Sequence, residues 1–223
     1  MKARFYFDYI SPYAFIGWQK LNQLRQNTGL EIEPVPLLFA GLLRAYGQIG
    51  PAEHPAKQKW MQKNIARKCE EMGIAIKAPQ FHPFNPLLGL RIAAEEQDLS
   101  VREKIIDALM SAVWQQQKHI SEEQDVIDAL DQAGLDSSAL IKQGLSKSAS
   151  DRLKSNTEEA IKQGVFGVPT IVIDEELFFG QDDYRYIELY LANKDPSKNE
   201  QGQDWLSSEW QASSMRKEMK QRS

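Results

Sequence analysis

The two β-rich stretches of this chain stand near its opposite ends, and this separation most constrains the fold. Residues 4–9 form a β-rich run with aromatic side chains on both faces, as in an inner strand, and Asp8 is the odd residue in it. In residues 30–37 apolar and polar side chains alternate, which predicts a second strand. Its two prolines cannot donate backbone hydrogen bonds, so either the strand lies at an edge of the sheet or the prolines mark its end. Residues 168–173 are rich in β-branched side chains, and after an acidic turn residues 177–179 return as the second strand of a hairpin.

Between these strands the pattern is helical. Ser11 is a natural N-cap, Pro12 suits the first helical position, and the helix that follows ends at Gly29. From residue 39 to about residue 163 the signal is helical almost throughout. Its clearest pieces are residues 57–72, 86–97, 101–117, 122–133 and 148–162.

The end of the chain changes character again. Asp182 or Asp183 caps a last helix, which runs to about residue 193. The tail that follows is polar, with Trp205 and Trp210 as its large aromatic side chains. We expect this tail to be either disordered or a docked peripheral helix.

The order of elements is therefore β-α-β, a long helical insert, and β-β-α. It predicts an α/β domain made of residues 1–38 and 164–195, with a small sheet flanked by helices. Residues 39–163 form a helical insertion subdomain that packs over one end of the sheet, and residues 196–223 form the polar tail.

Composition excludes several classes of protein. The formal net charge is −4 and 42% of the residues are apolar, which gives no sign of nucleic-acid or membrane affinity. The N-terminal residues do not resemble a secretory signal, so we expect a cytoplasmic protein. The single cysteine, Cys69, rules out an intrachain disulfide. His54, His82 and His119 show no metal-ligand spacing.

Two segments could bind an extended, negatively charged ligand. Ser11 lies where backbone N–H groups and the helix dipole favour an anion, although taken alone it fits a plain N-cap better. Pro169 either follows a cis peptide, which would expose the backbone of Val168, or is a trans proline that starts an edge strand.

Two further segments are polar and stand at helix starts. Residues 179–182 (FGQD) could hold the amine and carboxylate of a ligand, or could simply cap a helix. The loop of residues 47–51, with Arg44, Glu53 and His54 beside it, is either a flexible lip of a binding site or an ordinary surface loop.

Taken together, these segments resemble a known family. Residues 5–13 (FYFDYISPY), 164–170 (GVFGVPT) and 179–182 (FGQD) resemble, in order and spacing, the 2-hydroxychromene-2-carboxylate isomerases and kappa-class glutathione transferases. Residues 47–51 (GQIGP) and 83–87 (PFNPL) are also similar. Both groups are similar to disulfide oxidoreductase A, so the resemblance implies a thioredoxin-like fold with a large all-helical insertion. It also implies a homodimer.

The resemblance assigns roles to individual residues. Ser11 stands where the family has its glutathione-activating serine. Val168 stands at the position whose backbone, in the family, pairs with the cysteinyl backbone of glutathione. Pro169, beside it, matches the family's cis-proline. Gln48 matches a pocket residue that is often asparagine. The γ-glutamyl end of glutathione is assigned to the residues after the hairpin: Gly180, Gln181 and Asp182.

The acceptor side departs from the family. Some isomerases of the naphthalene pathway carry a lysine where Leu43 stands here, and Arg44 is adjacent to that position. Neighbouring pocket positions differ from Glu53 and His54. Arg44, Glu53 and His54 are therefore the candidate substrate-binding residues, and the aromatic substrate stays open.

The residues also exclude dithiol chemistry of the oxidoreductase A type. Such an enzyme needs a nucleophilic and a resolving cysteine, and residues 11–14 (SPYA) contain neither. Cys69, in a helical segment among charged neighbours, is interpreted as a structural or incidental thiol.

Three functions remain. The first is a glutathione-dependent isomerase acting on 2-hydroxychromene-2-carboxylate or a related aromatic-degradation intermediate, in which the Ser11 hydroxyl stabilises the thiolate. The second is a kappa-type transferase or peroxidase, which consumes glutathione and would leave a conjugate. The third is a non-catalytic thioredoxin-fold protein that binds unfolded peptides but not glutathione.

Overall fold

A four-stranded sheet joins the two β-rich stretches. The computed structural model describes residues 2–208, and its strands run in the order β2-β1-β3-β4. β1 is parallel to β2 and antiparallel to β3, so that Phe5 stands between Pro34 and Ile171. The central position of β1 and the edge position of the proline-containing strand confirm the sequence prediction. The bounds are β1 (Lys2–Phe7), β2 (Glu31–Pro36), β3 (Thr170–Ile173) and β4 (Glu176–Phe179).

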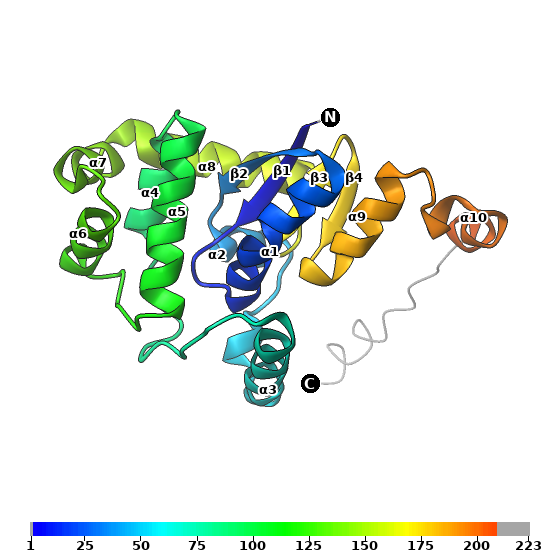
Figure 1. The fold of residues 1–223 in the computed structure, drawn as a ribbon, viewed down its shortest axis with the longest axis horizontal. Coiled ribbons are helices and arrows are strands. Elements are labelled where there is room, and N and C mark those ends of the chain that lie inside the picture. The colour runs from blue at the N-terminus through cyan, green and yellow to red at the C-terminus, as the bar shows by residue number, and fades with distance from the viewer. Residues whose placement is uncertain (1, 209–223) are drawn as a thin grey trace, which may run out of the picture. The chain divides into compact units, whose positions relative to one another are not determined.

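Both faces of β1 are covered, which explains the three consecutive aromatic residues at its end. Phe5 and Phe7 face α1 (Pro12–Thr28), where their ring centroids lie 5.9 Å and 6.4 Å from that of Trp18. Tyr6 faces the side of the sheet away from α1. Figure 1 shows α1 in front of the strands. The buried cluster on the side of Tyr6 consists of Tyr6, Val35, Leu37, Leu42, Ala160, Val165, Val168 and Val172.

Along the chain, the helical insertion follows β2 and precedes β3, and its colours run from light blue to yellow-green in Figure 1. The five helices predicted from periodicity are present, and two short ones, α2 and α7, are additional. α5 ends at Trp114, before the predicted residue 117, and Gln117 has a left-handed φ of 61° that a helix cannot contain. The bounds are α2 (Phe39–Ala45), η1 (Pro51–Glu53), α3 (Pro55–Met72), α4 (Leu87–Glu95), α5 (Leu99–Trp114), α6 (Glu123–Gln132), α7 (Ser137–Gly144) and α8 (Lys147–Lys162).

The C-terminal part follows the hairpin through η2 (Gln181–Asp183) and α9 (Tyr184–Leu191). The chain divides into two units, the first ending at Arg185 and the second starting at Tyr186. The described part of the tail contains η3 (Pro196–Lys198) and the helix α10 (Glu200–Ser207), in which Trp205 is exposed. Trp210 lies outside the described residues. Within residues 2–208, every helix is too short or too polar to cross a lipid bilayer.

Candidate active site

Ser11 lies at the turn from the end of β1 into α1. Its hydroxyl oxygen accepts a hydrogen bond from the N–H of Ala14 at 3.1 Å, which confirms the predicted N-cap. The same hydroxyl donates to the carbonyl oxygen of Val168 at 3.4 Å. Hydroxyl hydrogen bonds are typically about 2.7–2.8 Å long, so this one is weak. The hydroxyl can therefore rotate toward a better acceptor at little cost.

The start of α1 is also suited to an anion. α1 has no acidic residue in its first turn, so its own side chains do not neutralise the positive end of the helix dipole. Ser11 is itself 9% exposed, so water screens this end of the helix only in part. A negatively charged atom near the Ser11 hydroxyl would be stabilised by both the dipole and the hydroxyl.

The Val168–Pro169 peptide is cis. Of the two alternatives that the sequence left open, the structure therefore has the cis peptide and not the trans proline. Pro169 packs against α1 at Gly17, where an added Cβ would lie 3.1 Å from Cγ of the proline. The Tyr184 hydroxyl donates to the carbonyl of Gly17 at 3.0 Å and holds the same turn of α1. The fold therefore brings Ser11 and the Val168 backbone together across 157 positions of sequence.

The segment after the hairpin lies beside the same end of α1. Gly180 has a φ of 82°, and its N–H donates to the carbonyl of Pro169 at 2.8 Å. Gln181 is buried, and its side-chain amide donates to a carboxylate oxygen of Asp182 at 3.1 Å. Asp183 turns back to the hairpin instead, where its carboxylate accepts from the N–H of Phe179 at 3.0 Å.

The carboxylate of Asp182 is 67% exposed and forms an ion pair with Lys68 of α3. Tyr13, two residues beyond Ser11, interacts electrostatically with the charge of Asp182. Burial, and then the charge of Asp182, raise the pKa of Tyr13 to about 12. The Tyr13 hydroxyl donates to the side-chain oxygen of Asn64 on α3 at 2.9 Å. α1, α3 and η2 thus meet beside Ser11.

Asp8 is a buried carboxylate in the turn before Ser11. Its two oxygens accept hydrogen bonds from the N–H groups of Ile10, at 3.0 Å, and of Phe39, at 2.8 Å. Burial raises the pKa of Asp8 to about 6, and the two N–H groups oppose the rise. The turn that this carboxylate makes with Ile10 also ends β1 at Phe7, two residues before the predicted end.

Sequence reasoning did not identify Asp8, His82 or Trp114 as parts of the site. His82 and Trp114 hydrogen-bond to the carbonyl oxygens of Ile10 and Tyr9, at 2.9 Å and 3.0 Å. The only local signal was the single carboxylate of Asp8 beside an aromatic strand. The two ring residues left no such signal, because their role depends on the packing of the helical insertion.

The predicted substrate-binding lip is exposed. The side chains of Arg44, Gln48, Glu53 and His54 all lie at the surface. Glu53 accepts from the N–H of Gly50 at 2.8 Å, within its own loop. Among residues 2–208, no hydrogen bond or ion pair joins these four side chains to Ser11 or Val168.

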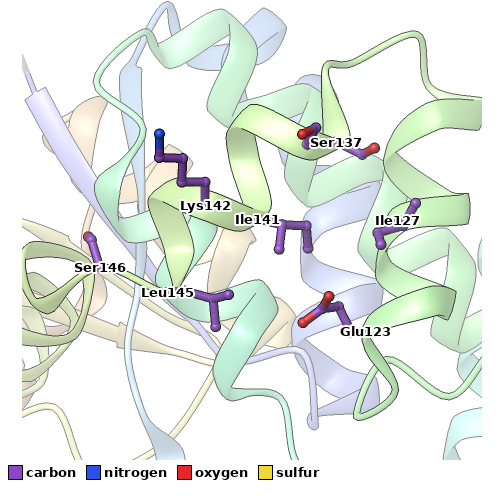
Figure 2. Close-up of a pocket in the computed structure, with 8 residues that line it drawn as sticks. Glu123, Ile127, Ser137, Ile141, Lys142, Leu145 and Ser146 are labelled. Carbon is purple, nitrogen blue, oxygen red and sulfur yellow. The ribbon is translucent and has the colours of Figure 1, made fainter.

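A hollow of about 570 Å³ lies between α6 and α7 (Figure 2). Ile127, Ile141 and Leu145 line it together with polar side chains, and its lining contains none of the predicted site residues. Cys69 is buried in α3, and burial raises the pKa of its thiol, which fits a structural role. In the described part of the chain, no three His, Cys, Asp or Glu side chains gather as a metal site.

The chain is similar to several characterised proteins. The 2-hydroxychromene-2-carboxylate isomerase of Pseudomonas putida is 28% identical over 197 residues, which cover 86% of this chain and 95% of the relative. The kappa 1 glutathione S-transferase of Rattus norvegicus is 25% identical over 205 residues, which cover 85% and 90%.

The fold is shared as well. A solved structure of a 2-hydroxychromene-2-carboxylate isomerase matches with a TM-score of 0.79 and 25% identity, covering 93% of this chain and all of that one. This confirms the predicted thioredoxin-like fold with its helical insertion. Residues 3–192 match the model of the DSBA-like thioredoxin domain, and the chain therefore belongs to the DSBA-like thioredoxin domain family.

Proposed function

We propose that this protein is a glutathione-dependent isomerase that acts on 2-hydroxychromene-2-carboxylate or a related aromatic-degradation intermediate. The observation that carries the proposal is the weakly bonded Ser11 hydroxyl, which lies at the start of α1 against the cis Val168–Pro169 segment. The motif SPYA at this position contains no cysteine, so a thiol that reacts here would have to come from a bound molecule.

The residues present fit a thiol peptide. The carbonyl of Val168 can accept from the cysteinyl N–H of glutathione, because its present donor, the Ser11 hydroxyl, holds it only at 3.4 Å. The Ser11 hydroxyl, once released, can donate to the sulfur and favour the thiolate. The positive end of α1 acts in the same direction. When bound, glutathione would supply a nucleophile that adds reversibly to the substrate and is regenerated.

The other end of glutathione is assigned to the segment after the hairpin. Its γ-glutamyl end carries an amine and a carboxylate. The exposed carboxylate of Asp182 can accept from the amine, and Lys68 holds that carboxylate beside Tyr13. Gly180 and Gln181 would complete this side: Gly180 makes the turn at a φ of 82°, and the amide of Gln181 donates to the carboxylate of Asp182.

We place the acceptor substrate on the side of the helical insertion, residues 39–163, above the sheet domain of residues 1–38 and 164–195. Gln48 would border glutathione, while Arg44, Glu53 and His54 would face an unsaturated aromatic acid. The exposed guanidinium of Arg44 suits the carboxylate of such a substrate. We further propose that the protein is a cytoplasmic homodimer.

A kappa-type glutathione transferase or peroxidase is the second candidate. The observation in its favour is that the kappa relatives match this chain over the same extent as the isomerases do, 85% against 86%. The two functions would share Ser11 and the glutathione groove and would differ in the fate of the thiol.

Two measurements test these proposals. Calorimetry should show glutathione binding at millimolar concentration; its absence would contradict both functions and leave the peptide-binding alternative. Incubation with glutathione and 2-hydroxychromene-2-carboxylate should then yield an isomer of the substrate with the glutathione concentration unchanged. A glutathione conjugate as the product would instead establish the transferase.

A further inference from the structure

The turn that carries Ser11 is held by side chains of the helical insertion. The carbonyl oxygens of two consecutive residues, Tyr9 and Ile10, each accept a hydrogen bond from a ring N–H group. Trp114 of α5 donates to the first at 3.0 Å, and His82, in the connection between α3 and α4, bonds to the second at 2.9 Å. Both donors come from outside the sheet domain that contains Ser11.

We propose that His82 is a positioning residue for Ser11: it holds the carbonyl of Ile10 and thereby fixes the orientation of the Ser11 hydroxyl. The inference rests on the proposed function, because the consequence of this orientation is the activation of a bound thiol. Neither the family match nor the sequence motifs assign a role to His82.

The hydrogen bond defines the tautomer of His82. A backbone carbonyl oxygen can only accept, so Nε2 of His82 must carry the proton. The ring plane is fixed by its neighbours as well: its centroid lies 5.9 Å from that of Trp114 and 6.1 Å from that of Phe84. His82 is thus an oriented donor aimed at a single acceptor.

The Ile10 carbonyl belongs to the same peptide plane as the N–H of Ser11. That N–H donates to the carbonyl of Asp8 at 3.3 Å, so both polar groups of this peptide are held. A rotation of the plane would change φ of Ser11, which is −92° in its N-cap conformation. The hydroxyl would then move relative to both Ala14 and Val168, which it now contacts at 3.1 Å and 3.4 Å.

The experiment is a titration of the thiolate absorbance of bound glutathione in a set of variants. His82→Phe keeps a ring between Trp114 and Phe84 but removes the donor, and should raise the apparent pKa of the bound thiol by about half a unit to one unit. His82→Gln restores an N–H donor and should return the titration close to that of the unmodified protein. His119→Phe is the matched control, since it removes another histidine of the insertion, one whose ring contacts Phe81 instead.

The double variant Ser11→Ala/His82→Phe tests the route of the effect. Because His82 acts through Ser11, we expect the double variant to titrate like Ser11→Ala alone. Additive shifts would overturn the positioning role, since they would mean that His82 acts on the sulfur directly. An unchanged titration in His82→Phe would overturn it as well. Far-ultraviolet circular dichroism checks that each variant is folded, and His82→Leu replaces the phenylalanine variant if that one is not.

Failure of this inference can be told apart from failure of the proposed function. If Ser11→Ala leaves the titration unchanged, the serine does not activate a thiol, and the proposed function itself is wrong. If Ser11→Ala shifts the titration and neither His82→Phe nor His82→Leu does, only the role of His82 is wrong.

Discussion

The turn of residues 8–11 and the lip of residues 44–54 both belong to the proposed site, yet they are built in opposite ways. The turn is buried, and its backbone is held by Asp8, His82 and Trp114. The lip is exposed at Arg44, Gln48, Glu53 and His54. Its hydrogen bonds are mainly internal, such as the one from the N–H of Gly50 to the carboxylate of Glu53.

This difference separates two tasks that the proposed function requires. Activating a thiol needs a hydroxyl held within a few tenths of an ångström, and burial with several hydrogen bonds provides that precision. Admitting an aromatic substrate needs accessible side chains on a surface that can adjust. We therefore expect substitutions in the turn to affect stability and the thiol titration, and those in the lip to affect the binding of the acceptor substrate or of glutathione but not the thiol titration.

Asp8 should give the largest effect, and it concerns the pH dependence of stability. Its pKa in the folded protein, about 6, lies above the ordinary aspartate value of 3.8, so the folded state binds the proton more tightly. The stability from this proton is complete below pH 3.8 and is lost as the pH rises through about 6. Between pH 7 and pH 4 the unmodified protein should gain about 2 to 3 kcal/mol relative to Asp8→Asn.

Urea unfolding of both proteins across this pH range measures that gain. Asp151→Asn, at an exposed carboxylate of α8, should reproduce the pH profile of the unmodified protein. A difference between the unmodified protein and Asp8→Asn that stays constant from pH 7 to pH 4 would show that Asp8 does not titrate in this window.

Ser11→Ala should raise the pKa of bound glutathione by roughly one to two units, because a charge-assisted hydrogen bond contributes about 1.5–3 kcal/mol. The thiolate at neutral pH should then fall by about tenfold to a hundredfold. Ser146→Ala is a matched control, because Ser146 caps α8 with the same 3.1 Å bond that Ser11 makes to α1. Both variants should lose about 1 kcal/mol of stability, and only Ser11→Ala should change the thiol titration. Coinciding curves would make Ser11 a helix cap and nothing more.

Asp182→Asn should weaken glutathione binding by about fivefold, since an exposed ion pair contributes up to about 1 kcal/mol. Calorimetry at neutral pH measures this change. Asp174→Asn removes the same charge from the hairpin turn, where φ is 54° and asparagine is tolerated, and should leave binding unchanged. If both variants bind glutathione equally well, Asp182 does not contribute to glutathione binding.

The lip should give the smallest effects. Arg44→Ala should raise the KM for the acceptor substrate by about twofold, as expected for an exposed charge. Gln48→Ala should weaken glutathione binding by less than about twofold. Neither change should move the thiol titration. A shifted titration in Arg44→Ala would break the division between turn and lip.

The sequence predicted those parts of the molecule that have local chemical signatures. The Ser11 cap, the inner first strand, the edge strand with two prolines and the hairpin follow from residue types that only a few conformations accept. The short helices α2 and α7 span only seven and eight residues, too few for a periodic pattern to emerge.

The supports of the site could not be predicted in this way. His82 and Trp114 contact the turn across 72 and 105 positions of sequence, so their role exists only in the packed structure. Asp8 was visible as an isolated carboxylate, but its second partner, the N–H of Phe39, belongs to the start of the insertion. Positions defined by tertiary contacts leave no local pattern to read.

The burial of Cys69 has a consequence for how such a protein would respond to its surroundings. A buried thiol with a raised pKa resists both oxidation and mixed-disulfide formation. The polypeptide would then accumulate no cysteine-oxidised form of its own under stress. Under the proposed function, its turnover would follow the supply of reduced glutathione, and replenishing that supply would restore activity without any repair of the protein.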